Sequence, residues 1–374
     1  MYCKLYFHKR NLSCLLVYSS TRLLVYYNKF ILMQLKKRQI AFLLFLIVAT
    51  AFILLNRNSL TRATFRTAEG SIFGTTYHIK YEAAQPLDSL ILDTLRRVDN
   101  SLSLFNQQST LCRINRGETM QADTMLAEVM RLALSISKVT GGDFDPTVQP
   151  LVSAWGFGFE HRANVTPQMI DSLMQFVGYQ KANIDEAGIV TRSDPRVRLD
   201  FGAIAKGYAV DCVAELLMRE GVSNYMVEIG GEVRTAGTND KGQAWHIGVS
   251  RPSEAAGEAD NAAVISVNDC AMATSGNYNN YYEADGKRYA HTISPHTGQP
   301  VTHSLLSATV VAPTCAEADA FATAFMSGGM ERAQAVLAEA KKANLRLDAF
   351  LIYSDEKGEM KTWATSGMPK LVEK

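Results

Sequence analysis

Hydrophobic positions recur with helical spacing in six stretches of this chain and alternate with polar positions in eight others. The helical spacing predicts helices at about 86–104, 122–139, 166–177, 203–220, 315–327 and 330–341. The alternation predicts strands near 71–81, 189–201, 224–237, 244–250, 262–275, 288–294, 304–312 and 348–354. Because helices and strands are interspersed without regular β-α-β alternation, the pattern favours an α+β fold over a doubly wound sheet.

An apolar run at Ile40–Leu55, interrupted only by Thr50, does not fit this globular pattern. Basic residues at 36–38 precede it, which predicts a transmembrane or signal-anchor helix at 40–55 with its N-terminal side in the cytoplasm. No small-residue cleavage site follows, so we expect an uncleaved anchor. Residues 1–39 then form a cytoplasmic segment, of which 1–32 would be lost if Met33 is the true start. We expect a linker at 56–66, followed by a single globular domain at 67–374 that is large enough for an enzyme.

The charge distribution separates the same two parts of the chain. No acidic residue precedes Glu69, and 11 of the 38 Lys and Arg residues do. The remaining 27 basic and 37 acidic residues give the body a net charge of about −10, which argues against nucleic acid as a partner. No Cys-x-x-Cys pair occurs, so we expect free thiols in the body, although an extracytoplasmic disulfide stays open.

The segment around Asp200 and Lys206 places an acid and a base at a predicted strand-to-helix turn. Gly202 and Ala203 between them permit close approach of a ligand, and a helix N-terminus suits a phosphate. The alternative is a tight turn packed on a sheet, with the lysine solvated.

Asp319 and Thr323 are four residues apart in a predicted helix, so their oxygens share one helix face. One carboxylate and one hydroxyl suit a hard divalent cation. Equally, the acid can interact with the helix dipole while the hydroxyl bonds back to a carbonyl of its own helix.

Further candidates lie in two loops and a strand. His291 lies on the predicted strand at 288–294, and the pKa of a histidine suits proton transfer near neutral pH, although a single histidine on a strand can equally be structural. Asp143 and Asp145 flank Phe144 after a glycine pair, and Phe144 and Phe105 are able to stack on a planar ring or to serve as core residues. The P-loop pattern and the G-x-G-x-x-G pattern are both absent, which excludes ordinary NTPase and Rossmann sites.

Taken together, these segments resemble the FAD:protein FMN transferase (ApbE) family. Nine segments match in order, from Phe73–Tyr77 to the helix at 315–327. They include SLSLFN at 101–106 with RIN at 113–115, GDFD at 142–145, SAWGFG at 153–158, EIGGE at 228–232 and ATSG at 273–276. Each segment alone is weak, but the ordered set is specific and covers nearly all of the body. The resemblance implies a single catalytic domain with mixed sheets and packed helices.

The resemblance also implies roles for individual residues. Mg²⁺ is held by side chains matching Asp319 and Thr323 and by the main-chain carbonyl of Ala203. FAD is held by residues matching Phe73, Phe105, Asp143, Phe144, Asp145, Asp200, Lys206 and Ile293. The chain departs from many relatives at Ser294, where Asp is common, and at Phe105, where Tyr is frequent.

Members of this family transfer the FMN half of FAD to a Thr or Ser hydroxyl of an acceptor protein and release AMP. The acceptors are subunits of membrane redox complexes, which agrees with a single-pass protein of the bacterial inner membrane whose catalytic domain faces the periplasm. In such a reaction His291 is our candidate for accepting the hydroxyl proton. Two alternatives keep the site: a Mg²⁺-dependent FAD pyrophosphatase that yields FMN and AMP, and a flavin-binding protein without catalysis.

Overall fold

The computed structural model describes residues 37–60, 63–157, 165–252, 261–276, 281–284, 287–290 and 292–369. The chain divides into two units, 1–62 and 63–374. Helix α2 (Lys37–Leu60) belongs to the first unit and contains the helix expected at 40–55, while the segment at 1–36 lies outside the described residues. Large apolar side chains from Phe42 to Val48 are exposed on α2. Among the described residues, no helix combines the length and hydropathy that crossing a bilayer requires.

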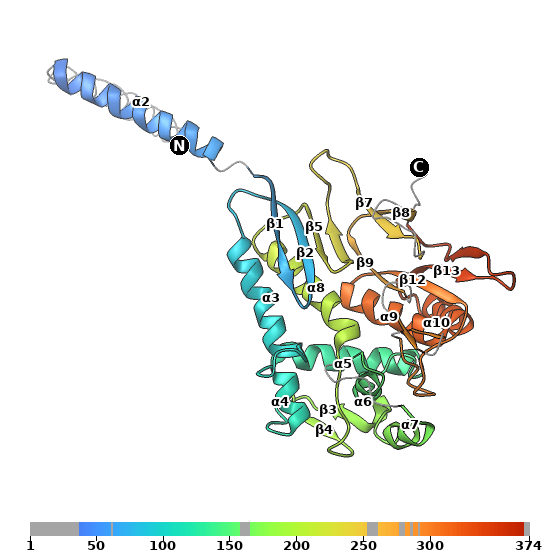
Figure 1. Cartoon of the computed structure of the whole chain (residues 1–374). Helices are drawn as coiled ribbons and strands as arrows, with labels where there is room; N and C mark the ends of the chain where they lie inside the picture. Colours follow the sequence, from blue (N-terminus) through green and yellow to red (C-terminus); the bar gives the residue numbers. More distant parts are fainter. Residues whose placement is uncertain are drawn as a thin grey trace, which may run out of the picture. The chain divides into compact units, whose positions relative to one another are not determined.

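The body is built around one antiparallel sheet, in the order β1-β2-β5-β6-β9-β12-β13-β14 (Figure 1). These strands are β1 (Thr64–Ile72), β2 (Thr75–Ala83), β5 (Tyr225–Ile229), β6 (Glu232–Ala236), β9 (Cys270–Gly276), β12 (Leu305–Ala312), β13 (Asp348–Ser354) and β14 (Met360–Ala364). Three further hairpins pair β3 (Ala182–Ile184) with β4 (Val190–Arg192), β7 (Trp245–Ser250) with β8 (Asn261–Val267), and β10 (Tyr281–Ala284) with β11 (Lys287–Ala290). The predicted linker at 56–66 spans the end of α2 and the start of β1.

Helices cover one face of this sheet. The two that matter most for the site are α8 (Gly202–Arg219) and α9 (Cys315–Gly328), which pack against each other and against the central strands. The others are α3 (Asp88–Leu102), α4 (Thr110–Arg116), α5 (Thr124–Val139), α6 (Gln149–Ala154), α7 (Pro167–Met174), the 3-10 turn η1 (Tyr179–Lys181) and α10 (Met330–Lys342). The α+β class expected from the sequence is confirmed.

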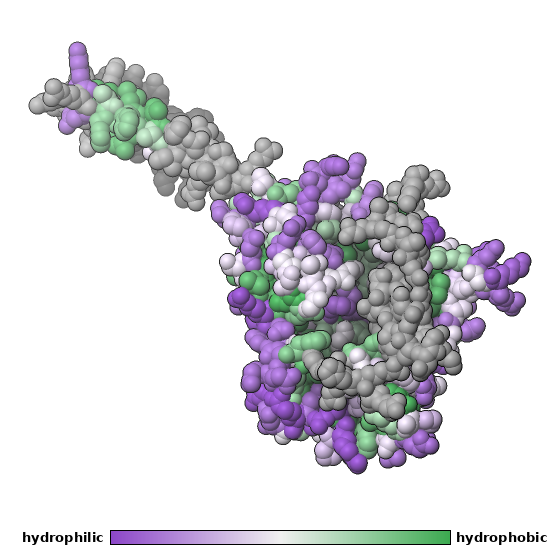
Figure 2. Space-filling view, viewed as in Figure 1, coloured by the Kyte–Doolittle hydropathy of each residue, from purple (hydrophilic) through white to green (hydrophobic). Residues whose placement is uncertain are grey.

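Central strands are buried on both faces, which explains their nearly continuous apolar sequence. On β12, Val310 belongs to the main core under the helices, whereas Val311 belongs to a second cluster with Trp245 and Ile265 of the β7–β8 hairpin. Successive residues of a strand point to opposite faces, so helices cover one face and a hairpin covers the other. The described surface of the body is mostly polar on the face seen in Figure 2.

Three of the predicted strands each run across a turn between two strands. The strand expected at 71–81 is part of the β1–β2 hairpin, whose two-residue turn places Phe73 and Gly74 at positive φ (54° and 74°). The strand at 224–237 is likewise a hairpin, turning at Gly230 and Gly231, and that at 262–275 is β8 followed by β9. The turns at Phe73–Gly74 and Gly230–Gly231 contain no polar side chain and leave the alternation almost unbroken, whereas Asn268 and Asp269 separate β8 from β9.

The strand expected at 189–201 ends at Arg192, so Leu199 is not in a strand. Instead, the side chain of Asn115 pairs with the backbone of Leu199: its amide donates to the Leu199 carbonyl and its oxygen accepts from the Leu199 N–H, each at 2.8 Å. The N–H of Asp200 donates to the Pro146 carbonyl at 2.8 Å. A side chain and a loop therefore supply the backbone hydrogen bonds that a neighbouring strand would have made.

A two-pocket candidate active site

Two adjoining pockets open beside the N-terminal end of α8. The first, which we call the apolar pocket, has a volume of about 270 Å³. The second, which we call the charged pocket, has a volume of about 460 Å³. They share Val152, Phe157, Asp200, Gly202 and Lys206, so these residues form a common wall. Together the pockets have the size of a site for an extended ligand such as a dinucleotide.

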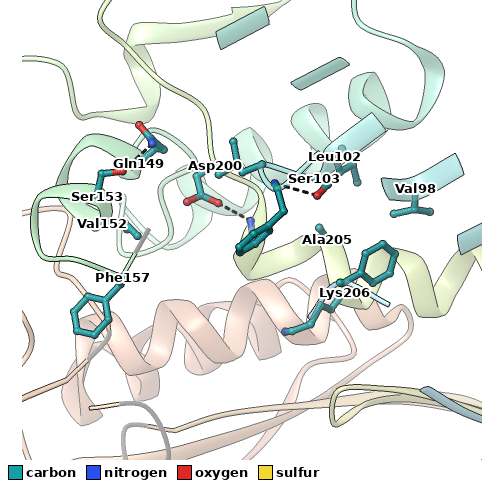
Figure 3. A pocket seen from close by; sticks show the side chains of 14 residues that line it. Val98, Leu102, Ser103, Gln149, Val152, Ser153, Phe157, Asp200, Ala205 and Lys206 are labelled. Atoms are coloured by element: carbon teal, nitrogen blue, oxygen red, sulfur yellow. Dashed lines mark hydrogen bonds between the residues drawn. The ribbon is translucent and has the colours of Figure 1, made fainter. Parts of the chain in front are cut away.

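Side chains from four parts of the chain enclose the apolar pocket (Figure 3). Val98 and Leu102 of α3 lie on one side, and Val152 and Phe157 lie on the other. Phe105, which is 77% exposed, also lines this pocket. The remaining lining residues are Phe73, Ser103, Leu104, Gln149, Ser153, Asp200, Gly202, Ala205 and Lys206. Apolar and aromatic walls of this kind suit a flat ring system.

Phe73 reaches this pocket from the strained turn of the β1–β2 hairpin. Its φ of 54° is a conformation that bulky residues rarely adopt, and it is one of three residues other than glycine with positive φ in the described chain. Such strain persists only where the surrounding structure enforces it, and it is concentrated at functional positions.

A buried charge cluster lies at the centre of the charged pocket. The ammonium of Lys206 is 2.6 Å from Glu232 Oε1 and 3.9 Å from Asp319 Oδ2. Burial opposes the charge of Lys206, but the two carboxylates outweigh that effect and raise its pKa, so the ammonium stays protonated. Burial and the charge of Asp319 raise the pKa of Glu232 to about 7, with Lys206 opposing the shift. Burial also raises the pKa of Asp319, against the opposing effects of Lys206 and the Gly207 N–H.

Asp200 stands at the shared wall, two residues before α8. Its Oδ1 accepts a hydrogen bond of 2.7 Å from the N–H of Gly202, the first residue of the helix (Figure 3). Burial raises the pKa of Asp200, and this hydrogen bond opposes the shift. The bond satisfies one of the free N–H groups at the helix start and fixes the carboxylate between the two pockets.

Gly207 allows α8 and α9 to approach closely enough to form the site. A Cβ atom at this position would lie 2.3 Å from the Cys315 carbonyl oxygen, so no larger residue fits without moving a helix. The Gly207 N–H donates to Asp319 Oδ2 at 3.1 Å. This close crossing brings Ala203, on the first turn of α8, to the same pocket as Asp319 and Thr323 on α9.

The start of α9 is fixed by two acceptors. Thr314 is the N-cap and accepts from the N–H of Glu317, an arrangement typical of a Thr-x-x-Glu sequence at a helix start. Asp211 of α8 accepts from the N–H groups of Cys315 and Ala316, at 2.9 Å each, and pairs with Arg234 at 2.7 Å. The helix that carries Asp319 and Thr323 is therefore held in register by α8 itself.

Two predicted ligand-binding acids have their carboxylates engaged by protein groups. Asp143 pairs with Arg332 at 2.5 Å and with His296 at 3.0 Å. Asp145 accepts from the N–H and hydroxyl of Thr147 and from the N–H of Tyr179. Both acids line the charged pocket, and these bonds hold the loop around Phe144 in place.

The loop at 292–300 is attached to α6 and α7. The indole N–H of Trp155 donates to the Gly298 carbonyl at 2.8 Å, and Ile293 packs with Leu151, Trp155 and Ile170. This cluster sets the position of Ile293 at the charged pocket.

The donor set of the charged pocket fits a hard divalent cation. Asp319 is 2% exposed, and the hydroxyl of Thr323 has one neighbour, Ser275 Oγ at 3.3 Å. Glu232 is 4% exposed, and its Oε2 has no hydrogen-bond partner among the described residues. Two buried carboxylates thus share one ammonium, which leaves negative charge for a cation to neutralise. No cluster of three or more His, Cys, Asp or Glu side chains suited to a metal occurs in the described part of the chain.

The structure brings the predicted site residues together, except that His291 lies outside the described residues. Phe73 and Phe105 line the apolar pocket, and Asp200 and Lys206 line both pockets. The charged pocket is lined by Asp143, Phe144, Asp145, Ala203, Ile293, Asp319 and Thr323. The four thiols of the described body are free, as expected: Cys112, Cys212, Cys270 and Cys315.

Several polar residues of the charged pocket received no role in the sequence analysis, namely Glu232, Thr274, Ser275, Thr292 and Ser327. Glu232 belonged to a motif but received no role, and its position after a glycine pair between apolar strands was the available signal. Ser327 continues the spacing of four that linked Asp319 to Thr323, so that pattern had been visible in the sequence.

The fold and the site define an α+β protein with a two-part cleft for a charged, ring-bearing ligand. The ApbE family matches residues 73–347. The chain is 37% identical over 320 residues to the FAD:protein FMN transferase of Haemophilus influenzae, covering 81% of this chain and 90% of that protein. It is 39% identical over 279 residues to that of Vibrio cholerae, covering 71% and 82%.

A solved structure of an ApbE protein is also similar to this chain. The flavin transferase ApbE from Vibrio cholerae superimposes with a TM-score of 0.72 and 35% identity, covering 82% of this chain and 98% of that chain. The chain belongs to the ApbE family, and the family expected from its motifs is confirmed.

Proposed function

We propose that this chain transfers the FMN half of FAD to a Ser or Thr hydroxyl of an acceptor protein and releases AMP. The observation that carries the proposal is the meeting of an apolar pocket and a charged pocket at Asp200 and Lys206. FAD has the matching parts, ring systems at its ends and a pyrophosphate between them. The names of the curated relatives, FAD:protein FMN transferase, agree with this assignment.

The proposed metal is Mg²⁺, held by the Asp319 carboxylate, the Thr323 hydroxyl and the main-chain oxygen of Ala203. When bound, it supplies charge neutralisation at the pyrophosphate and thereby eases the departure of AMP. The buried oxygen donors of the charged pocket and the Glu232 oxygen without a hydrogen-bond partner among the described residues support this choice of a hard cation.

Lys206 has a role that does not depend on the metal. Its ammonium lies in the wall shared by the two pockets and stays charged because of Asp319 and Glu232. A fixed positive charge at that point attracts the pyrophosphate and orients FAD across the two pockets. Phosphoryl transfer needs mainly such positioning and charge stabilisation, so the enzyme requires no nucleophile of its own.

The acceptor protein supplies the nucleophile. Its hydroxyl oxygen attacks the phosphorus of the FMN half, a new P–O bond forms, and the bond to the AMP oxygen breaks. We assign His291 as the base that takes the hydroxyl proton, an assignment that rests on its sequence position beside Thr292 and Ile293 of the charged pocket.

The proposed location and partners rest on the sequence. The uncharged run at 40–55 with basic residues before it supports a membrane anchor and a body on the periplasmic side of a bacterial inner membrane. Acceptor subunits of membrane redox complexes are then within reach. Membrane fractionation of cells, followed by protease treatment of spheroplasts, tests this: an anchored body is degraded from outside, whereas a protected body contradicts the proposal.

One incubation tests the function. The full chain is mixed with FAD, MgCl₂ and an acceptor domain that carries a target Thr or Ser, and the products are measured by mass spectrometry. We expect the acceptor to gain the mass of one FMN while AMP appears in equal amount. Free FMN without acceptor labelling would indicate a pyrophosphatase, and unchanged FAD would indicate a binding protein. Chelation with EDTA tests the metal requirement.

A further inference from the structure

Helix α9 presents a third polar side chain to the charged pocket, beyond the two assigned to the metal. Asp319, Thr323 and Ser327 all line this pocket and are spaced four residues apart. Residues with this spacing form one stripe along a helix, and eight residues span about 12 Å of its axis. The pocket therefore follows α9 well past the metal-binding pair.

The hydroxyl of Ser327 is buried without a partner. The residue is 7% exposed, and its Oγ has no hydrogen bond to any described residue. Buried hydroxyls in helices usually bond back to their own helix: Ser137 donates to the Ala133 carbonyl at 2.8 Å, and Thr140 donates to that of Ile136 at 2.9 Å. Ser327 does not use this bond, and an unsatisfied buried polar group is unfavourable unless something else satisfies it.

Unsatisfied buried polar atoms are rare in folded proteins and call for an explanation. The described chain has four in side chains: Glu232 Oε2, Thr235 Oγ1, Ser307 Oγ and Ser327 Oγ. Only Glu232 and Ser327 among these line either of the two pockets described here. Glu232 lies beside Lys206, so its free oxygen belongs to the charge cluster, whereas Ser327 is two helical turns beyond Asp319.

The acidic side chain near Ser327, that of Asp143, is already paired with a basic side chain. The next residue, Gly328, is close to Asp143, because a Cβ there would lie 2.7 Å from Asp143 Oδ2. That carboxylate is paired with Arg332 and hydrogen-bonded to His296. With its acid already paired, this end of the pocket suits an uncharged polar group better than a phosphate.

We propose that the Ser327 hydroxyl forms a hydrogen bond with an uncharged polar group of FAD, in either its flavin or its adenosine half. Ser327 is then a substrate-binding residue that fixes one end of FAD while the pyrophosphate lies near Asp319 and Lys206. This inference rests on the proposed function, since FAD is its ligand.

The test compares Ser327→Ala with the wild type in a titration that follows flavin fluorescence on binding of FAD. We expect the dissociation constant for FAD to rise about tenfold, the effect of losing one neutral hydrogen bond in a buried site. The unfolding midpoint of the free protein should stay the same or rise, because the variant removes an unsatisfied hydroxyl. A loss of FAD affinity without a loss of stability distinguishes a binding role from a structural one.

Ser307→Ala is the matched control, because Ser307 is a buried, unpartnered serine on β12 that lines neither pocket. The unfolding midpoint of Ser307→Ala should stay the same or rise, as in Ser327→Ala, but the FAD affinity of Ser307→Ala should equal that of the wild type. Titrations with FMN and with AMP then identify the half of FAD that Ser327 contacts, since one of the two should lose affinity in Ser327→Ala.

Wild-type affinity for FAD in Ser327→Ala would overturn the proposed contact while leaving the transferase proposal intact. An equal loss of affinity in Ser307→Ala would also overturn it, because the effect would then come from the fold. A wild-type chain that binds no FAD would overturn the transferase proposal as well.

Discussion

The two pockets share a wall but differ in what they offer a ligand. The apolar pocket is formed by side chains such as Val98, Leu102 and Phe105, and its charged lining residues are the two on the shared wall. The charged pocket concentrates Glu232 and Asp319 around Lys206 and adds hydroxyls along α9 and β9. The difference leads us to expect that the apolar pocket contributes mainly to binding a ring and the charged pocket mainly to stabilising the charge of the phosphates. Substitutions on either side should therefore affect different kinetic constants.

The largest effect is expected from Asp319→Asn in the charged pocket. Asn keeps an acceptor for the Gly207 N–H but removes the charge that we propose holds the metal. Transfer of FMN to the acceptor should fall by about 10²–10³-fold, as when a main electrostatic contribution to the transition state is lost. The rate is measured by acceptor mass gain at saturating FAD. An unchanged turnover would exclude the metal role, and circular dichroism confirms that the variant is folded.

Lys206→Met tests the shared wall. Removing the ammonium leaves Glu232 and Asp319 buried together without a counter-charge. Loss of one partner from such a cluster should lower the free energy of unfolding of the free protein by about 3 kcal/mol. Added MgCl₂ should restore more stability in this variant than in the wild type, because the cation replaces the lost charge. Urea unfolding with and without MgCl₂ measures both, and an equal response to magnesium in the two proteins would contradict the shared cluster.

Phe105→Ala should have the smallest effect on activity, and this effect should come from the apolar pocket alone. Because the ring is 77% exposed, its removal should barely change the unfolding midpoint. Loss of a stacking interaction that contributes about 1 kcal/mol to FAD binding should raise KM for FAD about fivefold with little change in kcat. Leu90→Ala is the control, since Leu90 is an exposed apolar residue of α3 outside both pockets. A fall in kcat without a change in KM would show that the two pockets do not divide binding and chemistry.

Much of the fold was predictable because the helices carry their own signals. Helices α8, α9 and α10 begin and end within one residue of the positions expected from their apolar spacing. Leu199 was assigned to a strand because its alternation was correct, but the partner that would define the strand is the side chain of Asn115. Such long-range partners cannot be identified from local periodicity.

The site was predictable only where a motif had a local geometry. Asp319 and Thr323 were paired by helical spacing alone, whereas the carbonyl of Ala203 entered through family resemblance. The meeting of these groups depends on the close crossing at Gly207, which involves a residue 112 positions away from Asp319. The engagement of Asp143 by Arg332 is equally invisible in the sequence, because the two residues are far apart in the chain.

The order of the pocket residues along the chain has a consequence for biosynthesis. The lining of the apolar pocket is complete at Lys206, whereas the charged pocket needs α9 near the C-terminal end. On the ribosome, the lining of the apolar pocket is therefore synthesised before the acid and hydroxyl that we propose as metal ligands. If Asp319 and Thr323 hold the metal as proposed, a nascent or truncated chain that lacks α9 cannot cleave FAD, and cleavage of the dinucleotide waits until synthesis is nearly finished.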